Sequence, residues 1–139
     1  MPRCWTVIRK TIYVPMVVGD QERALRFYTE ILGFEKRQDY QQPGHPRWLT
    51  VAPGGQELEF ILVKGEHAPS HPEPDADSGG NHWVFLTDDC RKDVGLLKAR
   101  GVEFKGNGAV EAPYGTSAYF TDPDGNHLTL LQPREQPRK

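Results

Sequence analysis

The chain has 139 residues, of which 17 are basic and 19 are acidic. This length fits one domain, here taken as residues 1–139, and it buries enough apolar surface to fold without disulfides or structural metals. A nearly balanced charge lacks the basic surface that neutralises phosphates, which argues against nucleic acid as a partner. The apolar runs are too short to cross a bilayer and no secretory leader is recognisable, so we expect a cytoplasmic protein without a membrane partner.

The first half of the chain has the pattern of a strand, a helix and three more strands. An apolar strand is predicted over residues 11–18, and a helix follows that begins at the N-cap Asp20 and ends at Gly33. Three strands are then predicted over residues 34–39, 47–52 and 56–63, with a Pro-Gly-Gly turn before the last one. The next segment, about 64–80, is rich in Pro, Gly, Asp and Ser and is predicted to be a linker.

The second half, about 81–132, repeats this order. A strand over residues 82–87 leads into a helix that is capped by Asp88 or Asp89 and ends at Gly101. Further strands are predicted over 102–104, 117–121 and 127–131, the last two joined by an Asp-Pro-Asp-Gly-Asn turn. Residues 111–116 are expected to form either a lid over a ligand site or an ordinary connection. The number of residues from Asp88 to Gly101 equals that from Asp20 to Gly33, and this equal spacing indicates an internal repeat.

This repeat predicts an α+β fold of two βαβββ modules, the first over about 11–63. One helix covers only one face of a small sheet and leaves the other face concave. Two such sheets would pair into an eight-stranded cup with the helices outside. The second sheet of the cup could come from the same chain or from a partner chain.

Four stretches carry a resemblance to a known family: VVGDQERALRFYTEILGFE at 17–35, HWVFLTDD at 82–89, LKARGVEF at 97–104 and PYGTSAYFTDPDGNHLTLLQ at 113–132. Over about 12–132 the chain resembles the vicinal oxygen chelate superfamily, which includes glyoxalases, bleomycin resistance proteins and extradiol dioxygenases. The resemblance implies a small-molecule ligand in the cup and a homodimer. It fixes the fold more firmly than the function.

The resemblance also implies where a metal would bind. The four family ligand positions hold Tyr13, Glu59, His82 and Thr129. Only Glu59 and His82 are good ligands, because a tyrosine or threonine hydroxyl does not ionise readily near neutral pH. His127 shares a strand face with Thr129 and is either a third ligand or a solvated histidine at the rim. No cofactor is therefore expected; the alternative is one divalent metal (Zn, Ni, Mn or Fe).

These residues are compatible with two functions. The first is a small-molecule-binding protein that sequesters a drug or metabolite, with ligand-binding side chains supplied by Tyr13, Trp48, Phe60, Tyr114 and Thr129. The second is a metal-dependent lyase, isomerase or dioxygenase acting on a substrate with vicinal oxygens. If Glu59 and His82 meet, they would suit catalytic acid–base work. Otherwise His82 is a hydrogen-bonded histidine and Glu59 a solvated carboxylate.

Overall fold

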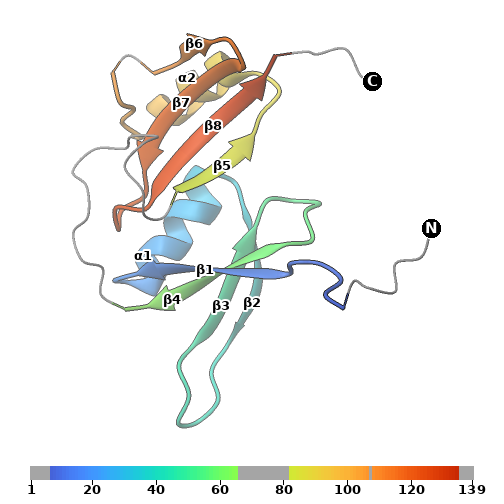
Figure 1. Cartoon of the computed structure of the whole chain (residues 1–139). Helices are drawn as coiled ribbons and strands as arrows, with labels where there is room; N and C mark the ends of the chain where they lie inside the picture. Colours follow the sequence, from blue (N-terminus) through green and yellow to red (C-terminus); the bar gives the residue numbers. More distant parts are fainter. Residues whose placement is uncertain (1–6, 66–81, 107, 135–139) are drawn as a thin grey trace.

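Two four-stranded sheets, each with one helix packed on it, make up the computed structural model (Figure 1), which describes residues 7–65, 82–106 and 108–134. The prediction of an α+β fold of two βαβββ modules is confirmed. The predicted linker lies outside the described residues from residue 66 onward. Within the described residues, no helix has the length and apolar character needed to span a bilayer.

The first sheet has the order β1-β4-β3-β2, with β1 and β4 parallel and the other pairs antiparallel. Its strands are β1 (Tyr13–Val18), β2 (Glu35–Tyr40), β3 (Trp48–Ala52) and β4 (Glu59–Lys64). Helix α1 (Gln21–Arg26) continues into a single π-helical turn, η1 (Phe27–Ile31). As predicted, the Asp20 carboxylate caps α1 by accepting from the backbone N–H of Arg23 at 3.1 Å.

The second sheet repeats this plan with the order β5-β8-β7-β6. Its strands are β5 (His82–Leu86), β6 (Val110–Ala112), β7 (Gly115–Thr121) and β8 (His127–Pro133). Helix α2 (Cys90–Ala99) begins at the predicted N-cap Asp89, whose carboxylate accepts from the N–H of Lys92 at 3.1 Å. Gly33 and Gly101 follow the two helices, and their positive φ angles of 83° and 95° are those expected of left-handed residues after a helix.

One strand prediction was wrong. Residues 102–104 form only an isolated bridge, from Phe104 to Phe120, and the fourth strand of the sheet is β6 instead. Segment 111–116 forms the β6–β7 hairpin rather than an irregular loop. Gly115 permits this turn: its φ is 144°, and a Cβ there would overlap the backbone carbonyl oxygen of Gln132 on β8.

Aromatic rings pack the two modules against each other. Phe60 of β4 lies 5.6 Å from Trp83 and 5.8 Å from Phe85 of β5, between ring centroids. Phe34 lies 5.5 Å from Phe85 in an edge-to-face arrangement. Trp83 and Phe85 alternate with the exposed Val84 and Leu86 along β5, so their rings lie on the sheet face that meets the first module. These contacts bury apolar surface between the sheets and so help to fix their relative position.

A buried polar cluster at the Asp-Pro-Asp-Gly-Asn turn also joins the modules. The phenol of Tyr28 donates to Asp122 Oδ2 at 2.7 Å, and the side-chain amide of Asn126 donates to the carbonyl of Val17 at 3.1 Å. Asp124 Oδ1 accepts from the N–H of Gly19 at 2.7 Å. Because these bonds run from the turn to β1, to Gly19 before α1 and to η1, the turn fastens the last strand pair to the first strand and its helix.

Candidate functional site

The concave face of the first sheet carries a hollow of about 420 Å³ near the β2–β3 hairpin. We call this the first-sheet hollow; its lining residues are Tyr40, Gln42, His45, Pro46, Arg47, Trp48, Ile61, Val63 and Lys64. Ligand pockets commonly have volumes of about 300–1,000 Å³. The hollow is therefore large enough for a small organic molecule.

Aromatic side chains form one wall of the first-sheet hollow. Trp48 on β3 is the cross-strand partner of Tyr40 on β2, so both side chains lie on the same sheet face. The Trp48 ring meets the Tyr13 ring edge to face, with centroids 5.3 Å apart. Because Tyr40 is 53% exposed, this wall presents open aromatic surface on which a planar molecule can stack.

Next to this wall lies a polar cluster centred on Glu59. Glu59 Oε1 accepts from Gln38 Nε2 at 3.0 Å and from Thr50 Oγ1 at 2.8 Å, while Arg37 Nη1 lies 3.6 Å from Oε2. The amide of Gln38 also donates to the phenol oxygen of Tyr13 at 3.0 Å. Burial alone would raise the pKa of Glu59, but these hydrogen bonds and the Arg37 charge lower it below its ordinary value. Glu59 is therefore an ionised, fully partnered carboxylate at neutral pH.

A β-bulge explains how Arg37 reaches this cluster. The register of β2 against β3 shifts between Lys36 and Gln38, so Arg37 has no cross-strand partner. Its guanidinium also donates to the carbonyl oxygens of Pro53 at 3.0 Å and Gln56 at 2.8 Å. The bulge thus lets Arg37 and Gln38 both approach the same carboxylate.

The concave face of the second sheet carries a separate polar group. A ring nitrogen of His82 is hydrogen-bonded to the hydroxyl of Thr129, and the His82 ring lies 6.5 Å from that of Tyr119. His127 is only 2% exposed, so the interpretation of it as a solvated rim histidine was wrong. Its strand β8 is paired on both sides, with β5 and β7, which buries the position.

The predicted site residues thus divide into several groups. Tyr13, Trp48 and Glu59 gather on the concave face of the first sheet, whereas His82 and Thr129 meet on the second. Among the described residues, no hydrogen bond or ion pair joins Glu59 to His82. Phe60 is 5% exposed and lies in the core between the modules. Tyr114 is 53% exposed on the β6–β7 hairpin, with its hydroxyl 3.4 Å from that of Tyr119.

Sequence reasoning missed the partners of Glu59. Gln38 lies in the predicted strand over 34–39 and Tyr40 follows directly after it, so alternation continued by one residue could have placed both on one face. Thr50 and Trp48 have the same relation on the next strand. Arg37 had no such signal, because only the bulge turns it toward Glu59, and bulges leave no reliable mark in a single sequence.

The residues at the family's metal positions do not fit a divalent cation. The carboxylate of Glu59 is already bonded by two neutral donors and balanced by the Arg37 guanidinium, which would repel a metal ion. The phenol of Tyr13 and the hydroxyl of Thr129 are both occupied in hydrogen bonds. Over the described ranges, no three His, Cys, Asp or Glu side chains converge as a metal-binding group.

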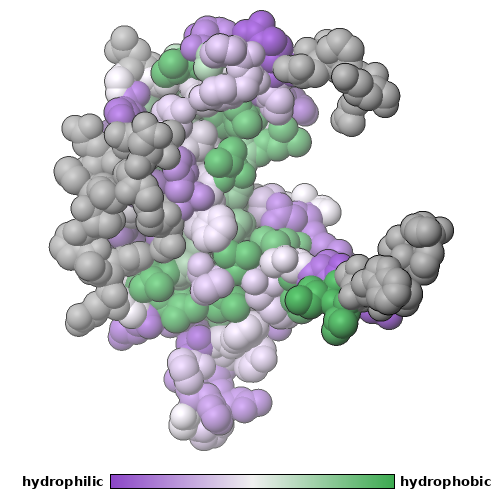
Figure 2. Space-filling view, viewed as in Figure 1, coloured by the Kyte–Doolittle hydropathy of each residue, from purple (hydrophilic) through white to green (hydrophobic). Residues whose placement is uncertain are grey.

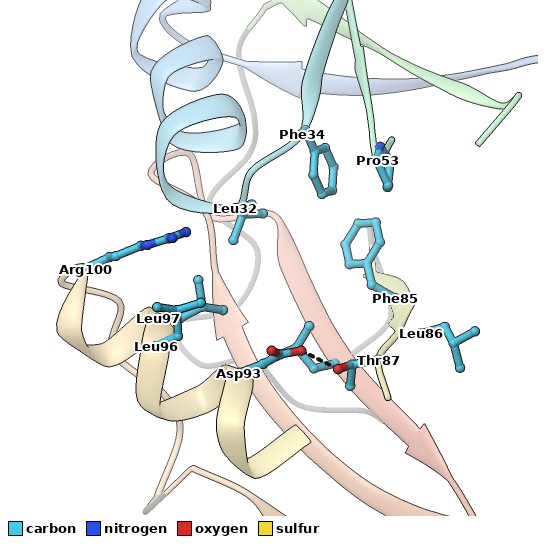
Figure 3. Close-up of a pocket in the computed structure, with 11 residues that line it drawn as sticks. Leu32, Phe34, Pro53, Phe85, Leu86, Thr87, Asp93, Leu96, Leu97 and Arg100 are labelled. Atoms are coloured by element: carbon cyan, nitrogen blue, oxygen red, sulfur yellow. Dashed lines mark hydrogen bonds between the residues drawn. The ribbon is translucent and has the colours of Figure 1, made fainter. Parts of the chain in front are cut away.

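A second cavity, of about 220 Å³, lies between the modules on the α2 side (Figure 3). Phe34 and Pro53 face it from the first module, and Leu97 and Phe85 face it from the second. Its charged groups are already bonded: Asp93 accepts from the Thr87 hydroxyl, and Arg100 Nη1 donates to the carbonyl of Ile31 at 2.6 Å. This cavity is a packing crevice whose polar groups serve the fold.

The comparisons with known proteins agree with this geometry. A family model described as "Glyoxalase/Bleomycin resistance protein/Dioxygenase superfamily" matches residues 10–130. The solved structure of TnmS3, described as an antibiotic binding protein from Streptomyces sp. CB03234, is 35% identical with a TM-score of 0.75. The match covers 93% of this chain and 99% of that one.

Two curated relatives are similar over most of this chain. YurT of Bacillus subtilis, described as uncharacterized, is 34% identical over 88% of this chain and 98% of its own length. An Arabidopsis thaliana protein named "Probable lactoylglutathione lyase, chloroplastic" is 28% identical over 89% of this chain, but the match spans only 36% of that protein. The matched residues and the paired βαβββ modules together show that this chain belongs to the glyoxalase/bleomycin resistance protein/dioxygenase superfamily.

Proposed function

We propose that this protein binds a small aromatic molecule in the first-sheet hollow and holds it without a metal-dependent chemical step. The observation that carries the proposal is the aromatic wall of Trp48 and Tyr40 beside a hollow of about 420 Å³. Glu59, the good metal ligand among the family positions on that sheet, is balanced by Arg37. The proposal places the chain in the same broad class as TnmS3, which is described as an antibiotic binding protein.

Binding of neutral naphthylmethanol, measured by calorimetry, tests this proposal. We expect about one molecule bound per chain, recovered chemically unchanged, and a loss of binding in Trp48→Leu. The matched control is Tyr114→Leu, which removes an exposed aromatic ring from the second sheet and should leave binding as it is. Absence of binding, or binding that survives Trp48→Leu, would contradict the proposal.

Elemental analysis separates this function from a metal enzyme. Protein purified without a metal-affinity tag and dialysed against a weak chelator should hold far less than one Zn, Ni, Mn or Fe per chain. It should also bind the probe as well as undialysed protein does. A stoichiometric metal would instead favour the lyase, isomerase or dioxygenase alternative.

The proposal includes a homodimer in which a second copy covers the open concave surface. Val84 and Leu86 on β5 are 57% and 77% exposed, and β5 is an edge strand of its sheet. In the space-filling view, apolar surface gathers over this part of the second module and again over β1 and β4 of the first (Figure 2). Apolar surface of this kind on both modules is typical of an interaction face.

A further inference from the structure

The first-sheet hollow has a definite charge. None of its nine lining residues is acidic, whereas Arg47 and Lys64 are cationic. The lining therefore combines aromatic side chains with cationic ones. A ligand that matches both kinds of side chain has an aromatic part and a charged or strongly polar part.

Two carboxylates are paired with Arg47, a lining residue of the hollow. Arg47 binds Asp39 with both arms of its guanidinium, at 2.8 Å for each contact, and it also lies 3.1 Å from Glu22. The hydrogen bond from Arg47 holds the pKa of Asp39 below its ordinary value, so this pair stays ionised. Arg47 therefore contributes little net charge, and it screens the hollow from both acids.

Lys64 is the cation that remains free to meet a ligand. It ends β4 at the edge of the hollow, is exposed, and takes part in none of the ion pairs formed among the described residues. The indole nitrogen of Trp48, another lining residue, is buried and has no acceptor within the described part of the chain. Both groups are donors, so both favour a ligand oxygen that accepts hydrogen bonds.

We propose that the ligand of the first-sheet hollow is a planar aromatic anion, with its ring on Trp48 and Tyr40 and its carboxylate or similar group facing Lys64. A cationic ring compound could also stack on Trp48. It would, however, meet Lys64 without any lining carboxylate to pair with. This inference rests on the proposed function, because it names the class of ligand for the same site.

Three naphthalene compounds of matched size test the charge: naphthoate, naphthylmethanol and naphthylmethylammonium. At low ionic strength, we expect naphthoate to bind roughly three- to fivefold more tightly than the alcohol, which is the range of an exposed ion pair, and the ammonium compound to bind most weakly. Added salt should reduce the preference for the anion. In Lys64→Gln the affinity ratio of naphthoate to naphthylmethanol should fall to about one. The control Lys105→Gln, which removes an exposed lysine of the second module, should keep the wild-type ratio.

The outcomes distinguish this inference from the proposed function. Equal affinities for anion and alcohol, with both lost in Trp48→Leu, would overturn the charge assignment and leave the proposed function standing. A preference for the anion that survives Lys64→Gln would also overturn it. If none of the three compounds binds in a Trp48-dependent way, the proposed function fails, and the inference fails with it.

Discussion

Replacing Tyr28 by Phe removes one hydroxyl from the cluster that joins the two modules. Tyr28 is fully buried, and its hydroxyl donates to Asp122 Oδ2 at 2.7 Å. The Asp122 carboxylate also accepts from the side chain of Asn126 at 2.8 Å and from the backbone N–H groups of Asp124 and Asn126 at 2.9 Å each. The variant therefore leaves a buried carboxylate with three donors. Hydrogen bonds to charged groups contribute about 1.5–3 kcal/mol, so we expect a loss of roughly 2 kcal/mol in the free energy of unfolding at neutral pH.

The size of this loss should depend on pH. Burial raises the pKa of Asp122 above its ordinary value of 3.8, and the Tyr28 hydrogen bond holds that rise back. The folded state therefore binds the proton more tightly than the unfolded chain, and the stability due to this group falls as pH rises through the window above 3.8. Without Tyr28 the pKa of Asp122 rises further and widens this window. The difference between wild type and Tyr28→Phe should consequently be largest at neutral pH and should shrink as pH falls.

Urea unfolding followed by tryptophan fluorescence at several pH values measures both effects. The control is Tyr40→Phe, which removes the hydroxyl of a half-exposed tyrosine and should change stability by less than about 0.5 kcal/mol. A Tyr28→Phe variant as stable as wild type at neutral pH would refute the role given to this bond. A loss that grows as pH falls would refute the ionised state assigned to Asp122.

Two more predictions concern the backbone and the proposed dimer. Gly115→Ala should cost about 3 kcal/mol in thermal or urea unfolding, because its Cβ would overlap the Gln132 backbone. Gly95→Ala, in α2 with open space around it, should instead add about 0.5–1 kcal/mol, and equal effects at both sites would contradict this reasoning. Leu86→Arg should convert a dimer to a monomer in sedimentation or light scattering, whereas Leu96→Arg on α2 should not. A monomeric wild type at micromolar concentration would rule out the dimer.

The repeat of strand, helix and turn signals predicted most of the fold, because those signals are local. Asp20 and Gly33 delimit the first helix through capping chemistry that depends only on neighbouring residues. The strand over 102–104 was wrong because strand identity depends on a distant partner, and β7 pairs with β6 beside Gly115 instead. His127 looked like a solvated residue next to a turn, yet pairing on both sides of β8 buries it.

The candidate site shows why a retained ligand residue does not establish a retained function. The family resemblance implied a metal ligand at Glu59, and the residue type there is still a carboxylate. Its charge is held by hydrogen bonds from Gln38 and Thr50 and by Arg37, which a one-residue bulge brings to 3.6 Å from the carboxylate. A guanidinium there supplies the positive charge that a metal ion would otherwise supply, while offering no open coordination position to a substrate. The same carboxylate thus serves to order Gln38, Thr50 and Tyr13 beside an aromatic wall, which suits a protein that holds a ligand by stacking rather than by chelation.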